Sequence, residues 1–122
     1  MTVPDSPAVS FEVVGDISIL PAAVEVAAYR IAQEAISNAT KHARAQRVTV
    51  RLSCTDDGLS VEVDDDGIGV AADINRSGVG LASMTERAIE LGGWCTNEHS
   101  STGGTRVKAW LPVLIEGSAI SA

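Results

Sequence analysis

The chain has 122 residues, 45% of them apolar, and its 16 acidic and 9 basic side chains give a formal net charge of -7. A chain of this length forms one domain and buries roughly two-thirds of its unfolded surface, so folding requires neither disulfides nor a structural metal. The negative charge and the four aromatic side chains argue against a nucleic-acid-binding protein, and no apolar run approaches the roughly 20 residues that span a bilayer.

The two cysteines, Cys54 and Cys95, belong to no CxxC motif and to no Cys/His cluster. Isolated thiols of this kind are typical of proteins from a reducing compartment, and they do not indicate a zinc site. We expect both thiols to be buried.

The N-terminal half predicts a strand followed by a long helix. Residues 1–9 contain two prolines and no hydrophobic periodicity, which indicates a flexible leader. Residues 11–14 are expected to form a short edge strand. After Pro21, which suits the first turn of a helix, residues 22–45 contain neither glycine nor proline and predict a helix over that whole range.

A hairpin and a long irregular segment are predicted next. Residues 47–54 alternate between apolar and polar side chains, as do residues 59–63, and Asp57-Gly58 between them is a strong hairpin signal. From residue 64 to residue 80 the alternation stops. A loop of this length in a small domain is typical of a functional segment.

The C-terminal part predicts a second helix and a second hairpin. Apolar spacing indicates a helix over residues 81–91, ended by Gly92-Gly93. Strands are expected at residues 94–99 and 105–111, and residues 114–122 are expected to form a flexible tail. The sum, for a domain over residues 10–113, is an α/β two-layer sandwich with a mixed, largely antiparallel sheet.

The long helix contains a polar stripe opposite a face of small residues. At 100° per residue, one side collects Arg30, Glu34, Asn38 and Lys41, and the small face collects Ala28, Ala32, Ala35, Ala39 and Ala43. A solvated face with i,i+4 pairs would explain the stripe. Asparagine is a poor helix-interior residue, however, and its amide oxygen can bind Mg²⁺ beside a carboxylate and a phosphate-binding cation. Both interpretations remain open, as do a surface role and a phosphate contact for His42.

Three adjacent acids precede two glycines in the segment from Asp64 to Gly69. Adjacent carboxylates raise one another's pKa, so an ordinary turn would contain only one of them. One fixed carboxylate can accept a hydrogen bond from an exocyclic amino group, while the glycines let a flat ring approach the backbone. A metal site is the alternative, although a calcium loop needs a longer run of oxygen ligands.

A second glycine pair, Gly78 and Gly80, comes directly before the second predicted helix. The N–H groups at a helix N-terminus favour an anion, so this segment is a candidate triphosphate cradle. The chain contains no GxxxxGK[ST] motif, and the glycine pair does not follow the first strand of a βαβ unit.

In this order, the elements resemble the ATP-binding catalytic domain of the GHKL superfamily, whose Bergerat fold is shared by gyrase, Hsp90, histidine kinases and MutL. The segment from Tyr29 to Ala43 is similar to the N-box of sensor histidine kinases of the NarL-partnered subfamily. The resemblance covers residues 10–113. No Phe-containing F-box is visible, and residues 70–77 would form an unusually short ATP lid.

The resemblance implies ATP and Mg²⁺ as cofactors. Glu34 would be the catalytic acid that organises or deprotonates the attacking group, Asn38 would coordinate Mg²⁺, and Asp65 would accept the adenine amino group. The other implied nucleotide contacts are Lys41, His42, Gly67, Gly69, Gly78, Gly80, Leu81 and Thr105.

The resemblance also implies a cytoplasmic domain cut from a longer, membrane-associated sensor. It would transfer the γ-phosphoryl group of ATP to a histidine on a separate dimerisation and phosphoacceptor domain of the same kinase, which would then serve a response regulator. We expect no nucleic-acid partner and no direct membrane contact. Two alternatives are an anti-sigma-factor-type serine kinase and a nucleotide-gated interaction module without transfer chemistry. Residues 81–93 resemble the histidine-kinase version.

Overall fold

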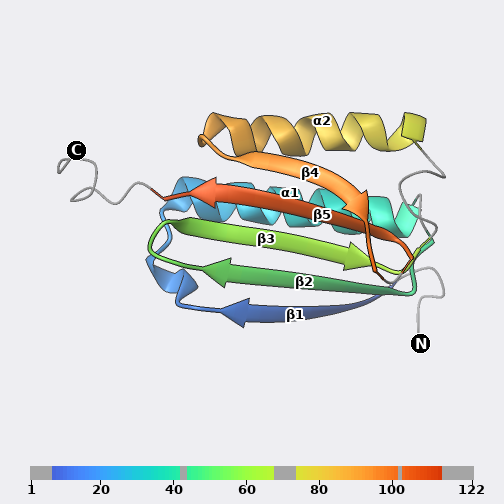
Figure 1. Cartoon of the computed structure of the whole chain (residues 1–122), viewed down its shortest axis with the longest axis horizontal. Coiled ribbons are helices and arrows are strands. Elements are labelled where there is room, and N and C mark those ends of the chain that lie inside the picture. Colours follow the sequence, from blue (N-terminus) through green and yellow to red (C-terminus); the bar gives the residue numbers. More distant parts are fainter. Residues whose placement is uncertain (1–6, 42–43, 68–73, 102, 114–122) are drawn as a thin grey trace.

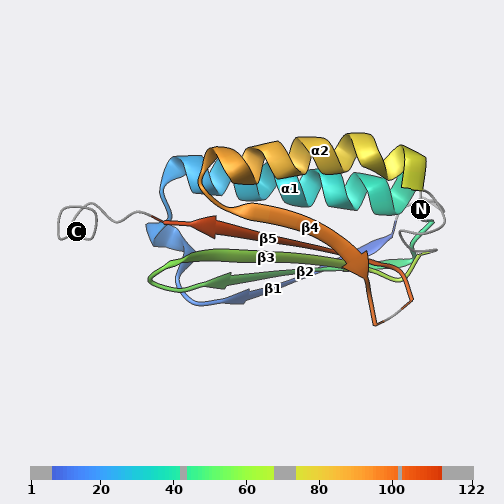
Figure 2. The same cartoon turned by 45° about the horizontal axis from the view of Figure 1, so that its top comes forward.

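Two helices pack on one face of a five-stranded sheet in the computed structural model, which describes residues 7–41, 44–67, 74–101 and 103–113, with the backbone alone at 74–81 (Figure 1, Figure 2). The strands are β1 (Ala8–Val14), β2 (Arg47–Cys54), β3 (Gly58–Asp65), β4 (Trp94–His99) and β5 (Thr105–Pro112). The helices are α1 (Ala22–Lys41), α2 (Ile74–Glu90) and the short 3-10 helix η1 (Ile17–Ile19). No helix in the described ranges has the length and hydropathy to cross a membrane.

The sheet has the order β1-β2-β3-β5-β4. β1 pairs with β2 in parallel, and the three other neighbouring pairs are antiparallel. A parallel pair requires a crossover connection, which α1 supplies. The predicted two-layer sandwich with a mixed, largely antiparallel sheet is therefore confirmed.

β1 is longer than the sequence predicts. It begins at Ala8, inside the segment expected to be a leader, because the Ala8 N–H donates to the Gln46 carbonyl at 2.9 Å and each residue to Val14 has a partner on β2. The strand lies at the edge of the sheet, as predicted.

α1 ends at Lys41, four residues before the predicted end. Arg44 has a left-handed φ of 52°, and the Ala45 N–H returns to the Ala39 carbonyl at 3.0 Å. This reversal directs the chain into β2. The small-residue face is confirmed where it is described, because Ala28, Ala35 and Ala39 are buried against the sheet and Ala32 is partly buried.

α2 begins at Ile74, seven residues before the predicted start, and β3 extends to Asp65. The prediction of an irregular segment over residues 64–80 was therefore wrong at both ends. Residues 74–90 contain no proline, and a glycine in a helix costs only about 1 kcal/mol relative to alanine. The predicted glycine end is confirmed. Gly92 has φ 84° and donates to the Ile89 carbonyl at 2.9 Å, and the Gly93 N–H reaches the Ala88 carbonyl at 2.8 Å.

The core lies between the helices and the sheet. Its largest fully buried side chains are Ile31, Leu59, Met84, Leu111, Val48, Val50 and Val61. Cys95 is buried as predicted, and burial raises the pKa of its thiol to about 11. Cys54 is only half-buried, so the expectation of two buried thiols was wrong for this residue, which lies at the end of a strand.

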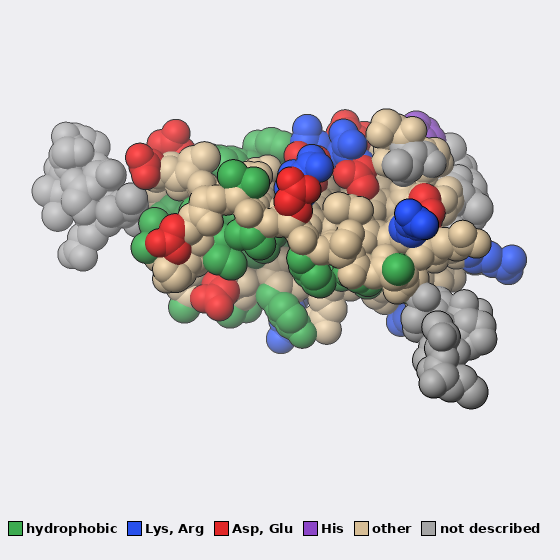
Figure 3. Space-filling view, turned by 90° about the horizontal axis from the view of Figure 1, so that it is seen from below, with side chains coloured by type: hydrophobic (Ala, Val, Ile, Leu, Met, Phe, Trp, Pro, Cys, Tyr) green, Lys and Arg blue, Asp and Glu red, His purple; other side chains and the backbone are tan. Residues whose placement is uncertain are grey.

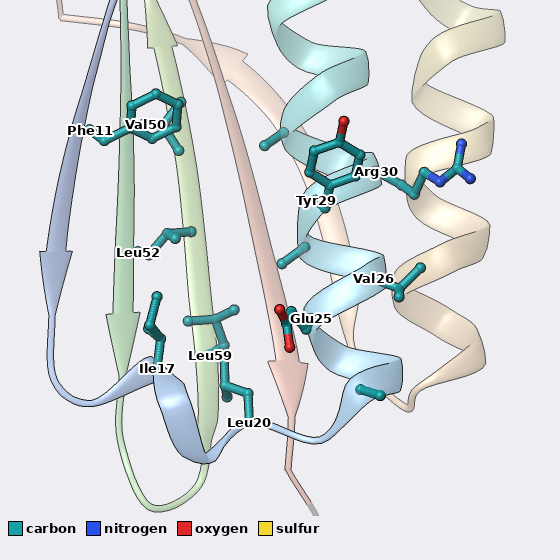
Figure 4. A pocket seen from close by; sticks show the side chains of 13 residues that line it. Phe11, Ile17, Leu20, Glu25, Val26, Tyr29, Arg30, Val50, Leu52 and Leu59 are labelled. Atoms are coloured by element: carbon teal, nitrogen blue, oxygen red, sulfur yellow. The ribbon is translucent and has the colours of Figure 1, made fainter.

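Part of the helix-side face of the sheet is uncovered. α1 packs mainly on β3 and β5, and α2 packs mainly on β4. Phe11 pairs in register with the core residue Val50 yet is 66% exposed. It lines a groove of about 630 Å³ together with Leu52 and Tyr29 (Figure 4). Hydrophobic side chains also reach the surface in the view from the β1 side (Figure 3).

The positions of Ile31 and Phe11 predict unequal costs of truncation. Ile31→Ala should lower the free energy of unfolding by about 3 kcal/mol, because a fully buried side chain leaves a cavity. Phe11→Ala should lower it by less than about 1 kcal/mol, because most of the ring remains in water. Urea denaturation of both variants measures the difference, and equal losses would contradict the description of β1 as an uncovered edge.

Candidate functional site at the end of the sheet

The candidate site lies at one end of the sandwich, where α1 and β3 end and the turn between β4 and β5 lies (Figure 1, Figure 2). Both views show these segments together, with the start of α2 above them. The C-terminal part of the predicted α1 stripe and the three aspartates therefore lie at the same end of the domain.

The three adjacent aspartates have different hydrogen-bond donors. Those of Asp66 lie at the start of β2, whereas Asp65 and Asp64 both accept from the region of the β4–β5 turn. Asp66 Oδ1 accepts the backbone N–H groups of Gln46 at 2.8 Å and Arg47 at 3.0 Å. These bonds lower the pKa of the exposed Asp66 carboxyl. Asp66 therefore ties the end of β3 to the start of β2, directly after α1.

Asp65 is the buried member of the triplet, with a relative exposure of 7%. Its Oδ1 accepts the Gly67 N–H at 2.8 Å and the Thr105 N–H at 3.2 Å. Burial raises the pKa of this carboxyl, and the charges of Asp66 and Asp64 act in the same direction, while the two N–H bonds oppose the rise. The structure therefore keeps a desolvated carboxylate at the end of an inner strand.

Gly104 lets the β4–β5 turn approach this carboxylate. A Cβ atom at Gly104 would collide with the carbonyl oxygen and with Oδ1 of Asp65. Only glycine allows this contact between two backbones. This role of Gly104 was not predicted, because it depends on the strand register and has no local signal in the sequence.

Asp64 contacts the same turn from the outer face of the sheet. One of its oxygens, Oδ1, accepts the Ser100 Oγ–H at 2.7 Å and the Arg106 Nε–H at 2.8 Å. The three carboxylates thus have separate partners and do not converge. No group of three or more His, Cys, Asp or Glu side chains in the described ranges is placed to hold a metal ion, and the alternative of a metal site at the triplet gains no support.

The polar stripe of α1 is only partly solvated. Glu34 and Asn38 are half-buried, whereas Arg30 and Lys41 are exposed. Glu34 lines a groove of about 260 Å³ between α1 and α2, whose other lining residues are Arg30, Gln33, Ser37, Ser83, Met84 and Arg87. Ser83 and Arg87 were not among the predicted site residues, although their i,i+4 spacing on the predicted second helix is visible in the sequence.

The structure brings together some of the predicted site residues and not others. Asp65, Gly67 and Thr105 share hydrogen bonds. Glu34, Asn38 and Lys41 lie on α1. His42 and Gly69 lie outside the described residues. Gly78, Gly80 and Leu81 lie within α2, so the predicted helix start after Gly80 was wrong, because the helix already begins at Ile74. The role of these three residues as nucleotide contacts stays a prediction.

Known proteins match this sequence and this fold. Residues 23–115 match the family described as histidine kinase-, DNA gyrase B-, and HSP90-like ATPase. The chain is 38% identical over 97 residues to the signal transduction histidine-protein kinase/phosphatase UhpB of Salmonella typhimurium, covering 80% of this chain and 19% of that protein. It is 38% identical over 94 residues to the sensor histidine kinase LiaS of Bacillus subtilis, covering 76% and 26%.

A solved structure agrees with these relatives. The ATP-binding domain of PrrB from Mycobacterium tuberculosis has a TM-score of 0.64 and 26% identity, covering 93% of this chain and 84% of that one. The fold and these matches define an ATPase domain of the histidine kinase, gyrase and Hsp90 type. The chain belongs to this family, as an ATP-binding catalytic domain of histidine kinases. It spans 19%, 26% and 29% of the length of three curated relatives that it matches.

The raised pKa of Asp65 predicts a pH-dependent stability difference. The folded chain binds the proton of the Asp65 carboxyl more tightly than the unfolded chain does. The stability that this proton binding contributes is therefore fully present below the ordinary pKa of 3.8, and it is lost as the pH rises through the pKa of the folded state. Asp65→Asn keeps an oxygen acceptor and removes the buried charge. We expect this variant to unfold at a higher urea concentration than the wild type at about pH 7. The difference between the two urea midpoints should shrink towards about pH 4.

The matched control for this measurement is Asp56→Asn, which changes an exposed carboxyl outside the site. It should show no such advantage at neutral pH. An Asp65→Asn variant that is less stable than the wild type at every pH would contradict a desolvated carboxylate.

Proposed function

We propose that this domain binds Mg-ATP at the end of the sheet and transfers the γ-phosphoryl group to a histidine on a separate dimerisation and phosphoacceptor domain. The observation that carries the proposal is the buried Asp65 carboxylate, held by the N–H groups of Gly67 and Thr105. The family match and the names of the relatives, which are sensor histidine kinases, support it.

Asp65 would recognise adenine through the exocyclic amino group. An ionised carboxylate is a strong hydrogen-bond acceptor. A buried carboxylate without its donor is costly, because the free energy of its desolvation is not offset by a hydrogen bond. A site built in this way rejects an otherwise similar base without the amino group. Gly67, one residue beyond Asp66, leaves room for a flat ring beside the backbone.

Asn38 and Lys41 would bind the triphosphate end of the nucleotide with Mg²⁺. Mg²⁺ in nucleotide sites is held by one or two protein oxygens together with phosphate oxygens, and the half-buried amide of Asn38 fits that requirement. Bound Mg²⁺ would neutralise phosphate charge, which a chain of net charge -7 needs in order to hold ATP. Lys41, exposed at the end of α1, would add a cation.

Glu34 would act on the incoming phosphoacceptor. It lies in the groove between α1 and α2 with Arg30 and Arg87, near enough to the surface to be reached from outside. In the transfer, an imidazole nitrogen of the acceptor attacks the γ-phosphorus, and the bond from that phosphorus to the bridging oxygen breaks to release ADP. Glu34 would orient the acceptor and take up its proton.

The acceptor histidine is proposed to lie outside this domain. His99 is at the end of β4, in a strand, and His42 lies outside the described residues. The acceptor domain, a downstream response regulator and a cytoplasmic location remain proposals for the whole protein. Membership of the NarL-partnered subfamily stays a prediction.

A transfer assay with Glu34→Gln tests this function. The chain is incubated with labelled ATP and a two-helix phosphoacceptor domain, and the product should lose its label in acid, as phosphohistidine does. Glu34→Gln should retain ATP binding and slow transfer by about 100-fold, because a positioned acid or base contributes on that order. Glu25→Gln, on the exposed first turn of α1, is the control.

The products of this assay separate the alternatives. An acid-stable product would indicate a serine kinase, and ATP binding with no labelled product would indicate a nucleotide-gated interaction module. Equal transfer rates for Glu34→Gln and Glu25→Gln would make Glu34 structural.

The role of Asn38 has its own test. Asn38→Ala should weaken ATP binding by about tenfold or more in the presence of Mg²⁺ and much less in EDTA, because the lost group is a metal ligand. Calorimetry with and without Mg²⁺ measures both values, with Ser37→Ala as the neighbouring control. An equal loss of ATP affinity with Mg²⁺ and in EDTA would show that Asn38 is not a metal ligand.

A further inference from the structure

Asp64 joins the two ends of the β4–β5 turn. Its Oδ1 accepts the hydroxyl of Ser100, the first residue after β4, and the Nε–H of Arg106, the second residue of β5. The side chain of Asp64 is 19% exposed, so these two bonds are largely shielded from water. The strand register favours the contact, because Asp64 and Arg106 are direct partners on β3 and β5.

The turn held by Asp64 is closed by its own backbone. The Ser100 N–H donates to the Gly104 carbonyl at 2.9 Å, and the Gly103 N–H donates to the Ser100 carbonyl at 3.0 Å. A displacement of Ser100 therefore displaces Gly104. Asp64 fixes Ser100 and in this way fixes the position of the whole turn.

The same turn contacts Asp65, which is the candidate adenine acceptor. Gly104 lies so close that a Cβ atom there would collide with Asp65, and the Thr105 N–H donates to Asp65 Oδ1 at 3.2 Å. Asp64 thus fixes the β4–β5 turn, and this turn contacts Asp65. A shift of the turn would change both the direction and the solvation of the Asp65 carboxylate.

The Asp64 contact differs from the other ion pairs on the outer face of the sheet. Arg51 meets Glu12 at 3.5 Å, and Lys108 meets Glu98 at 3.9 Å, in both cases between more exposed side chains. Glu62 lies 3.8 Å from the same guanidinium that Asp64 meets at 2.8 Å. Exposed pairs of the longer kind contribute little, whereas a shielded carboxylate with two donors fixes geometry.

We propose that Asp64 is a positioning residue that fixes the β4–β5 turn against Asp65 and thereby sets the preference of the pocket for adenine over bases that lack the 6-amino group. The inference rests on the proposed role of Asp65 in ATP binding. It assigns a nucleotide specificity effect to a side chain on the outer face of the sheet, which acts only through the turn.

The test compares the affinities of ATP and inosine triphosphate, which has an oxygen in place of the 6-amino group. Asp64→Ala should reduce the preference for ATP about tenfold, with the affinity for inosine triphosphate little changed. Asp64→Asn should lose less of this preference for ATP, because the amide keeps an oxygen acceptor. Ser100→Ala should also lose part of the preference. Glu62→Ala, which removes the other carboxylate near Arg106, is the matched control and should keep it.

The outcomes separate this proposal from the proposed function. A wild-type chain without a preference for ATP, or an Asp65→Ala variant that retains it, would overturn the adenine role and this inference with it. If those two behave as expected and folded Asp64→Ala keeps the wild-type preference, only the role of Asp64 is overturned. If Asp64→Ala does not fold, an unchanged preference in both Asp64→Asn and Ser100→Ala overturns it instead.

Discussion

The burial of the Asp65 carboxylate at the end of β3 is the constraint on which the site depends. A carboxylate is removed from water only when donors replace its hydration, and here they come from Gly67 beyond the strand and from Thr105, which lies 40 residues away in sequence. The glycine at position 104 makes room for that second donor. The end of β3 and the β4–β5 turn are therefore one arrangement, and the proposed recognition of adenine depends on both.

The two neighbouring acids extend this arrangement to the rest of the domain. Asp66 holds the start of β2, which follows α1, and Asp64 holds the turn on the other side. Adjacent carboxylates would repel one another in a simple turn, but each here has its own donors, and two of the three lie partly or fully in water. The triplet thus fixes the elements that flank the candidate site.

Local patterns in the sequence were sufficient for much of the fold. The alternation of residues 47–54 and the Asp57-Gly58 signal predicted β2 and its hairpin, because both depend on near neighbours along the chain. The start of β1 depends on pairing with residues 39 positions away, and the end of α1 depends on the left-handed Arg44. Neither has a local signal. The start of α2 was missed because its two glycines suggested a loop, although a helix tolerates them.

The candidate site was predictable only in part. Asp65, Gly67 and Thr105 were identified by resemblance, and the structure places them in one hydrogen-bonded group. The separate partners of Asp64 and Asp66 were not predictable, because three identical side chains in a row give no indication of which donors each will meet. That information lies in the register of β3 with β5 and in the path of the chain into β2.

Carboxyl NMR of the chain, labelled at aspartate, can follow the titration of Asp65 with and without Mg-ATP and so tests whether this buried carboxylate binds the nucleotide. We expect the pKa of Asp65 to lie above the ordinary value of 3.8 in the nucleotide-free chain, because burial disfavours the charged form. We expect Mg-ATP to lower this pKa, because the adenine amino group donates to the ionised carboxylate. An ordinary pKa without nucleotide would rule out the desolvated carboxylate, and a raised pKa that Mg-ATP leaves unchanged would rule out its contact with adenine.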